Sequence, residues 1–568
     1  LSCKGDILNE SSVIQIRLKK DPERINPLIF PNPVAREIYQ YIHLPLADYN
    51  PESLELEPLL IQNIPTAMSI DTGQYKGGIY YDVSLIKDAK WENGSPITSE
   101  DYLFTMKAIN LPLSSTPKYR DLVQNISDIV IDPNDIKKFR VIFKEDYMLA
   151  LETVVNIEIY PRYFYDSLNV LSNYPFSYLT ESNADAINGD STLVKFAEKF
   201  NGNDYSRNLI SGSGPYKLVS WTSDQNIVLE KKPDYWGSVK KQPALQQGPA
   251  KMIFHIIPDE LTAITQLKAG ALDVVNEISA DSYMALSTDP VYKEQFNFFH
   301  PSLTKHYFIS VNNQDPLLND ANVRLALGHL IDVDNMIANL ENGMAVRSVG
   351  PIHPSKKTYN DALAPISFDL DKAKELLASA GWKDTNNNGT LDKTIGGKLM
   401  EMELEILISG QELGKRLAII LQENAAKTGV KINIKEKEFK LIRAENLKTR
   451  NYQLVPSVLS QDINAWDDLS RWQSSEDTPN GGNESSYRST ATDALIDKIL
   501  VTKEDDKRIK LYKEIQAQLY ADQAAIFLYS PEEKIVISKN WSATSTVKRP
   551  GYMANTFKKI ANKVPSAN

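Results

Sequence analysis

The sequence predicts an α/β fold with more than one domain. The chain has 568 residues, which is room for several domains at about 150 residues each. Helical and strand patterns alternate along it, as they do in layered α/β proteins and not in β-sandwiches. Apolar residues make up 42% and charged residues 24% of the chain, which is the balance of an ordinary globular protein. No apolar run approaches the ~18 residues that a membrane-spanning helix needs.

The first half of the chain is expected to begin with a strand, because residues 13–18 alternate apolar and polar side chains. A capping box formed by Thr98 and Asp101 predicts the start of a helix that runs to residue 109. The other elements expected in this half are a helix near 34–45, a strand at 78–83, a glycine-bounded hairpin over 211–237, and a strand, a helix and a strand over 251–278.

The second half is expected to be richer in helices. Asp320 and Asp332 lie where N-caps are needed, and Gly343 and Gly381 lie where helices stop. The elements expected here are two consecutive helices over 320–343, a helix at 369–380, an amphipathic helix at 412–428, a strand at 430–434 and helices over 490–523.

Charge argues against a nucleic-acid partner. The net charge is -10 and the pI is about 5.4, whereas a nucleic-acid-binding protein needs a basic stripe to displace counterions. The acidic residues are spread thinly, so we interpret them as an aid to solubility.

No catalytic constellation is found in the sequence, and we expect the protein not to be an enzyme. Ser211-Gly212-Ser213-Gly214 has the wrong spacing for a nucleophile elbow, and no Lys-Ser/Thr pair follows it to make a phosphate loop. The six histidines are scattered and are interpreted as structural. Asp467 and Asp468 would suit a glycosidase, but adjacent acidic residues are common on solvated surfaces.

One stretch has the first half of a calcium loop. Asp384, Asn386, Asn388 and Asp392 follow the spacing of its ligands, but Ile395 occupies the twelfth position, where a bidentate Glu is required. The favoured interpretation is an Asx-rich turn, with weak ion binding as the alternative. No metal or other cofactor is expected.

The single cysteine, Cys3, lies at the start of the sequence. The absence of any other cysteine from the sequence excludes a disulfide framework and a Cys-based zinc site. Leu1-Ser2-Cys3 resembles the end of a bacterial lipobox, which predicts lipidation of Cys3 and anchoring in the cell envelope, on the periplasmic or outer face. Residues 1–12 are then a tether, and the chain would begin just before the cleavage point. The alternative is an incidental cysteine.

Several segments together resemble the family 5 solute-binding proteins, the dipeptide- and oligopeptide-binding class of ABC importers. They occur in the family's order along the chain, and the ordered set is more specific than any one motif. The segments are KWENGSPITSED at 90–101, GSGPY at 212–216, KPDYWG at 232–237, LKAGALDV at 267–274, VRLAL at 323–327 and AGW at 380–382.

The resemblance implies a type II, cluster C periplasmic-binding-protein fold, with two main lobes, a hinge and an extra inserted domain. Domain I would comprise residues 13–60, 205–300 and 525–568. Domain II would be an insertion at 61–204, and domain III the second lobe at 301–524. The resemblance further implies a ligand held between domains I and III, with Trp91, Thr98, Tyr216 and Trp236 as packing and capping residues.

The resemblance also implies a ligand site. The family meets the ligand amine with an Asp in a W-x-x-D-Y-x-D/E-P segment, which falls here on Asp462. Leu459 and Ile463 replace the Trp and the Tyr of that pattern, and the Pro is absent, so the ligand class is open. The other expected ligand contacts are Ser460, Gln461 and Trp466 in the same segment, and Phe30 and Asn32 in an N-terminal loop.

The function implied is capture of a peptide or similar small polar ligand for delivery to the permease subunits of an ABC importer, by a monomer. A buried ammonium would pair with a carboxylate, and a peptide backbone could pair with a strand edge near Ser460. The alternatives are a secreted hydrolase acting on peptides or glycans, and a ligand-sensing protein not coupled to import.

Overall fold

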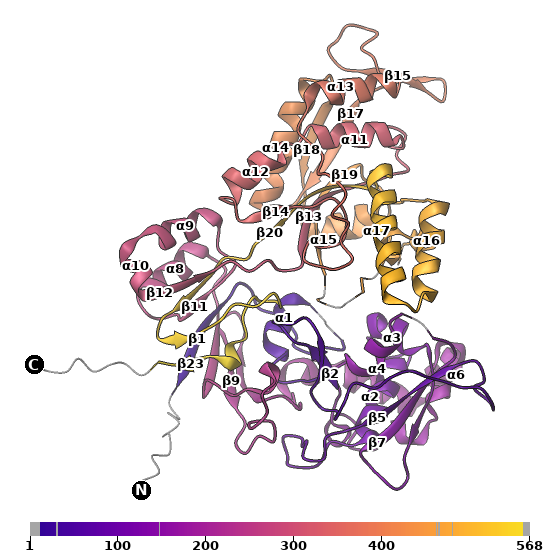
Figure 1. The fold of residues 1–568 in the computed structure, drawn as a ribbon, viewed down its shortest axis with the longest axis vertical. Helices are drawn as coiled ribbons and strands as arrows, with labels where there is room; N and C mark the ends of the chain where they lie inside the picture. The colour runs from indigo at the N-terminus through magenta and orange to yellow at the C-terminus, as the bar shows by residue number, and fades with distance from the viewer. Residues whose placement is uncertain are drawn as a thin grey trace, which may run out of the picture. The chain divides into compact units, whose positions relative to one another are not determined.

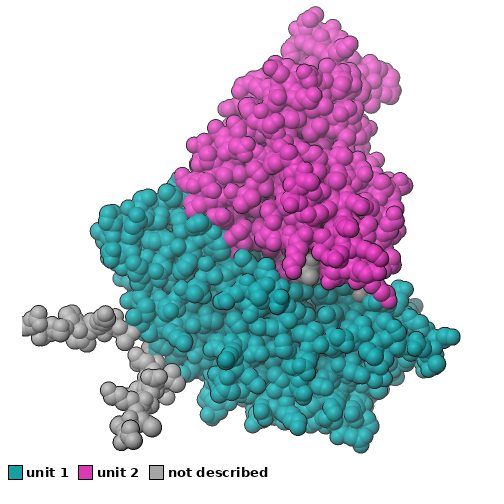
Figure 2. All heavy atoms as spheres, viewed as in Figure 1, with its two compact units in different colours: residues 1–301, 533–568 teal, residues 302–532 magenta. Residues whose placement is uncertain are grey.

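The computed structural model describes residues 12–29, 32–146, 148–461, 463, 466–467, 469–479 and 481–560. The chain divides into two compact units, shown in separate colours in Figure 2. Unit 1 comprises residues 1–301 and 533–568, and unit 2 comprises residues 302–532. The chain therefore passes from one unit to the other twice.

Unit 1 contains a seven-stranded mixed sheet assembled from distant parts of the chain. Strand β1 (Val13–Leu18) pairs in parallel with both β10 (Lys251–Ile256) and β11 (Val274–Val275). The strand order is β12 (Phe296–Phe299), β21 (Ile535–Ser538), β11, β1, β10, β9 (Asn226–Lys231) and β8 (Tyr216–Thr222). The helices of this part are α1 (Pro33–Tyr39), α8 (Glu260–Lys268), α9 (Ala280–Thr288) and α10 (Pro290–Gln295), and its small ribbon is β22 (Trp541–Ser542) with β23 (Lys558–Lys559).

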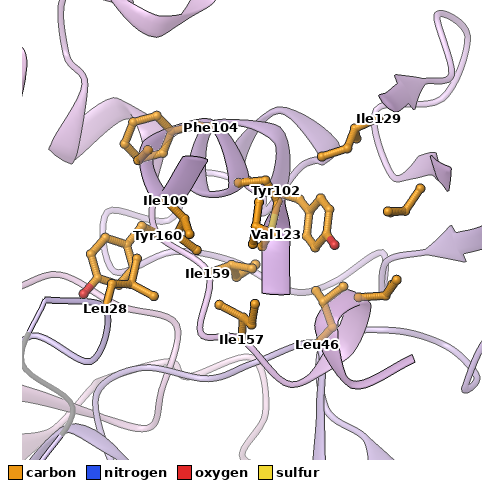
Figure 3. Packing of buried hydrophobic residues seen from close by; sticks show 14 of the residues in the cluster. Leu28, Leu46, Tyr102, Phe104, Ile109, Val123, Ile129, Ile157, Ile159 and Tyr160 are labelled. Atoms are coloured by element: carbon orange, nitrogen blue, oxygen red, sulfur yellow. The ribbon is translucent and has the colours of Figure 1, made fainter. Parts of the chain in front are cut away.

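A second hydrophobic core of unit 1 packs around α2 (Ser99–Asn110), whose Tyr102, Phe104 and Ile109 point into it (Figure 3). The sheet beside it has the order β4 (Met68–Ser69), β5 (Ile79–Ser84), β7 (Lys138–Phe143) and β6 (Ile126–Ile131). The remaining elements are the ribbon β2 (Ala47–Tyr49) and β3 (Leu56–Pro58) and the helices α3 (Pro117–Val123), α4 (Ala150–Val155), α5 (Arg162–Tyr165), α6 (Ala184–Gly189) and α7 (Ser191–Asn201).

Unit 2 is built on a six-stranded sheet of order β14 (Ala345–Arg347), β20 (Ala525–Pro531), β13 (Lys305–Val311), β19 (Leu454–Ser460), β17 (Glu403–Ile408) and β18 (Lys431–Glu436). A hairpin joins β15 (Asp392–Ile395) to β16 (Lys398–Glu401). The helices are α11 (Ala321–His329), α12 (Val333–Leu340), α13 (Leu370–Ser379), α14 (Glu412–Ala426), α15 (Phe439–Leu441), α16 (Thr490–Val501) and α17 (Asp505–Asp522), and the last two lie side by side (Figure 1).

Most of the expected caps are present. Thr98 and Asp101 form the predicted capping box of α2, and the carboxylates of Asp320 and Asp332 accept backbone N–H groups of α11 and α12. Gly343 and Gly381 have positive φ values of 79° and 86°, which is why glycine is favoured where these helices stop.

The helix expected at 34–45 is wrong in its second half, because α1 ends at Tyr39. The carbonyls of Tyr41 and Ile42 instead accept hydrogen bonds from the N–H groups of Tyr216 and Gly214, at 3.0 and 2.7 Å. These carbonyls bond to the glycine-rich segment before β8, so they are not available to the i to i+4 hydrogen bonds that a longer α1 would need.

Strand β20 differs from the expected domain boundary. Residues from 525 onward were expected in domain I, but β20 pairs with β13 in the sheet of unit 2. Its Ile526, Leu528 and Tyr529 are buried in the core of unit 2, and only at residue 533 does the chain return to unit 1. The separation of residues 61–204 as an inserted domain stays a prediction.

None of the helices in the described part of the chain combines the length and the apolar character that crossing a bilayer requires.

Candidate functional site

The segment that the sequence singled out begins at the end of β19 in unit 2. Ser460 is exposed and pairs with Lys305 of β13. Gln461 continues the ladder, since its N–H donates to the carbonyl of Thr304 at 2.7 Å and its carbonyl accepts the Thr304 hydroxyl. The backbone of this segment is thus fixed to β13 up to Gln461.

Among the described strands, none pairs with one edge of β19 along most of its length. Strand β17 meets β19 only where Ile406 pairs with Leu454, so no described strand covers residues 455–460 on that side. In an antiparallel ladder successive residues point their N–H and C=O groups to opposite sides. Because Gln461 bonds toward β13, the alternation directs the N–H and C=O groups of Val458 and Ser460 toward the open edge.

The side chain of Gln461 enters a buried polar cluster. Its Oε1 accepts from the N–H of His353 at 3.1 Å and lies 2.9 Å from Nε2 of His306. Its Nε2 donates to Oδ1 of Asp467 at 2.8 Å. Gln461 therefore joins β13, the loop at 353 and the later part of its own segment.

Asp467 is held by two further groups. Its Oδ1 lies 2.5 Å from Nζ of Lys356, and both side chains are less than a tenth exposed, at 6% and 8%. Its main-chain carbonyl accepts the hydroxyl of Tyr512 on α17 at 2.6 Å. The interpretation of Asp467 as a solvated surface residue is therefore wrong, because buried charges require such partners.

Both histidines of the cluster have lowered pKa values. Burial lowers the pKa of His306 to about 4, with a smaller lowering by Lys356 and an opposing contribution from the Gln461 hydrogen bond. Burial also lowers the pKa of His353 to about 3, helped by His306 and Lys356. Both rings are neutral near pH 7, and their centroids lie 5.3 Å apart.

Trp466 packs on α17. Its ring lies 5.9 Å from that of Tyr512 at an interplanar angle of 28°, and the guanidinium of Arg508 lies 4.4 Å from the indole centroid. Arg508 and Tyr512 are one helical turn apart, so the indole is held against one face of α17 by scaffold residues. The structure thus supplies packing partners for Trp466, and its expected contact with a ligand stays a prediction.

The remaining predicted residues lie apart from this cluster or outside the described residues. Asn32, in unit 1, caps α1 by accepting the N–H of Ala35 at 2.9 Å, and its buried Nδ2 has no hydrogen-bond partner among the described residues. Phe30, Asp462 and Cys3 lie outside the described residues.

The side-chain oxygens of the possible calcium loop accept hydrogen bonds from other groups of the same loop. Asp384 accepts the N–H groups of Asn388 and Gly389, and Asn386 also accepts that of Asn388. Asp392 is buried and accepts the N–H and the hydroxyl of Thr385 at 2.8 and 2.6 Å. Across the described ranges no group of three or more His, Cys, Asp or Glu side chains is arranged to hold a metal ion. The bonds are those of the Asx-rich turn.

Sequence reasoning missed His306, His353 and Lys356. His306 and His353 are far apart in the sequence, and no local pattern relates them. The pairing of β13 with β19 brings His306 to Gln461, and the fold of the loop at 353 brings His353 and Lys356 to the same cluster. The alternation within residues 305–311 could have marked His306 as inward-facing, but not its partner.

The sequence is similar to known proteins over most of its length. The profile of bacterial extracellular solute-binding proteins, family 5 middle, matches residues 72–482. The oligopeptide-binding protein AppA of Bacillus subtilis is 25% identical over 487 residues, which is 84% of this chain and 80% of that protein. The nickel-binding periplasmic protein of Escherichia coli is 24% identical over 474 residues, which is 81% of this chain and 80% of that protein.

Solved structures share the fold. AppA of Bacillus subtilis in complex with a nonapeptide has a TM-score of 0.73 at 21% identity and covers 97% of this chain and 99% of its own. NikA from Brucella suis in complex with Fe(III)-EDTA has a TM-score of 0.74 at 19% identity and covers 96% of this chain and 100% of its own. The type II periplasmic-binding-protein fold is thus confirmed, and the chain belongs to the family 5 bacterial extracellular solute-binding proteins.

Proposed function

We propose that this protein captures peptides outside the cytoplasmic membrane and delivers them to the permease of an ABC importer. The observation that carries the choice of ligand is the open edge of β19. An extended peptide can add to such an edge through main-chain hydrogen bonds, which do not depend on its side chains. Val458 and Ser460 offer those groups, and Ser460 is exposed.

Relatives support peptides as the first choice and metal complexes as the second. AppA binds a nonapeptide in its solved structure, and a Thermus thermophilus relative binds a pentapeptide. NikZ from Campylobacter jejuni binds Ni(L-His). A metal complex has no extended main chain to pair with a strand edge.

The anchor and the location belong to the same proposal. Lipidation at Cys3 would attach the protein to the cell envelope, where residues 1–12 would serve as a tether. The relatives named periplasmic support a location outside the cytoplasmic membrane. Mass spectrometry of the protein recovered from membranes tests the anchor, which requires the added mass of a diacyl group on Cys3.

Native mass spectrometry of the purified protein, followed by denaturation, tests the ligand class. We expect peptides to be released. A released nickel or iron complex would replace peptides as the ligand, and turnover of an added peptide by the pure protein would contradict a binding function.

Asp462 is proposed to pair with the amino terminus of the ligand. The change Asp462→Ala should weaken peptide binding at least about tenfold, because it leaves a buried ammonium without its carboxylate. The melting temperature should hardly change. Calorimetric titration with an identified peptide measures the effect, and equal affinity in both proteins would remove Asp462 from the site.

A further inference from the structure

Gln461 directly precedes Asp462, the proposed ligand residue. Its side chain makes three hydrogen bonds that this position in the sequence does not explain. Its side chain ties the end of β19 to Asp467, six residues further along the chain. We propose that Gln461 is a positioning residue, which fixes the end of β19, where the proposed peptide-binding edge lies, against His353 and Asp467 before any ligand arrives. This inference rests on the proposed function.

The orientation of the Gln461 amide is determined by its neighbours. A backbone N–H can only donate, so the atom that meets the N–H of His353 at 3.1 Å is the oxygen Oε1. The opposite atom, Nε2, then faces the carboxylate of Asp467, which can only accept. Both contacts demand the same orientation, so a flipped amide would lose both.

The histidines complete this arrangement as neutral rings. Because Oε1 of Gln461 accepts, the proton of His306 lies on Nε2, and Nδ1 of His306 accepts the Ser530 hydroxyl at 3.0 Å. Nδ1 of His353 accepts the N–H of Ser355 at 3.2 Å, which places its proton on Nε2 as well. The hydroxyl oxygen of Ser302 lies 3.3 Å from Nε2 of His353 and can accept that proton.

The described groups that contact Gln461 and Asp467 include three side chains of unit 2. His306 lies on β13, Lys356 follows the loop at 353, and Tyr512 lies on α17. None of these contacts needs a ligand. A site held in its binding geometry in advance avoids the ordering cost of binding, and its apparent affinity falls in proportion when that geometry becomes less populated.

The change Gln461→Met tests the proposal, because methionine keeps an unbranched side chain of similar length but cannot make these hydrogen bonds. A pool of synthetic pentapeptides of mixed sequence serves as the probe, and mass spectrometry quantifies the peptide retained at each pool concentration. We expect half-saturation to need about tenfold more of the pool, because the binding geometry becomes less populated when these hydrogen bonds are lost.

Gln453→Met is the matched control. Gln453 directly precedes β19, and its side chain makes two hydrogen bonds, to Asp315 at 3.2 Å and from the N–H of Glu405 at 2.7 Å. Its loss should lower the stability of unit 2 to a similar extent and leave peptide retention unchanged. Equal losses of retention in the two variants would mean that Gln461 is merely structural.

Gln461→Glu adds a readout that a structural role would not give. Glutamate keeps an acceptor for His306 but turns a second carboxylate oxygen toward Asp467, where a donor is needed. We expect weakened retention at about pH 7.5 and partial recovery relative to the wild type at about pH 5, where the new carboxyl gains a proton. A variant that is equally impaired at both pH values would contradict the proposal.

Two failures are distinguishable. Retention of the pool by the wild type and by Gln461→Met with equal affinity overturns the positioning role alone. A wild-type protein that retains no peptide overturns peptide binding, and the inference with it.

Discussion

At the residue scale, the ion pair between Lys356 and Asp467 has the largest expected effect on stability. Both side chains are buried, and their atoms lie 2.5 Å apart. Lys356→Met leaves the Asp467 carboxylate buried without its ammonium, which should cost about 3–5 kcal/mol of unfolding free energy. Urea titration followed by tryptophan fluorescence measures this loss.

Lys415→Met is the comparison for this prediction. Lys415 pairs with Glu436 at 3.2 Å in the same unit, but the two side chains are 39% and 54% exposed. Exposed pairs contribute at most about 1 kcal/mol. Equal losses in the two variants would mean that burial of Asp467 does not decide the cost.

Residue roles were predictable from the sequence only where the chemistry is local. Thr98, Asp320 and Asp332 act on N–H groups within a few positions, and each caps the expected helix. Asp467 gains its partner Lys356 from a distant loop, so composition alone favoured a solvated surface. Non-local pairing of this kind leaves no local pattern in a single sequence.

At the element scale, the glycines of the GSGPY motif allow two backbones to approach closely. A Cβ on Gly212 would lie 2.2 Å from the carbonyl oxygen of Ile42, and one on Gly214 would lie 2.5 Å from that of Tyr41. Both oxygens belong to the backbone and cannot rotate away. The motif is therefore a packing device of unit 1.

Gly212→Ala should destabilise unit 1 by about 1–3 kcal/mol, because the backbone has to shift to admit the methyl group. Thermal unfolding, compared with that of Gly189→Ala, measures the effect. Gly189 ends α6 and has nothing within 4 Å of its missing Cβ. A Gly212→Ala protein as stable as Gly189→Ala would contradict this role.

Elements were predicted well where a pattern spans a whole helix or strand. Strand β1 has the expected bounds of 13–18, and the hairpin over 211–237 is β8 and β9. The prediction for α1 failed because its apolar stripe continues past Tyr39, while the bonds that end it come from residues 214 and 216. The spacing of apolar residues carries no information about a distant segment that competes for the backbone hydrogen bonds of a helix.

At the scale of the whole molecule, three buried neutral histidines make stability depend on pH. Burial lowers the pKa of His43 and of His353 to about 3, and that of His306 to about 4. The unfolded chain takes up these protons near pH 6.5, so below that value it binds more protons than the folded chain. Acid therefore favours unfolding.

We expect the unfolding free energy to fall by about 1.4 kcal/mol per pH unit for each of these groups between about pH 6.5 and pH 4. Unit 2 contains two of the three residues, His306 and His353, and should lose more. Hydrogen exchange read out by mass spectrometry measures each unit separately. Opening energies that stay constant from about pH 7.5 to pH 5 would contradict the prediction.

The fold class and the family could be predicted from the order of the motifs, because these motifs extend over most of the chain. The identity of the ligand could not be predicted in this way. The residues that choose a ligand are few, and at Leu459 and Ile463 this chain departs from the family pattern. The open edge of β19 depends on which strands pair, and that depends on the whole sheet.

The position of β21 has a consequence for the order in which the molecule matures. This strand, near the end of the chain, lies inside the seven-stranded sheet, with β12 on one side and β11 on the other. During synthesis, β12 emerges long before the strand that joins it to the rest. Residues 302–532 are continuous and can complete their own core first. A nascent chain thus carries residues 1–301 without their last partner strand until the residues after 532 appear. Until then the unpaired edges of β11 and β12 are open to premature association.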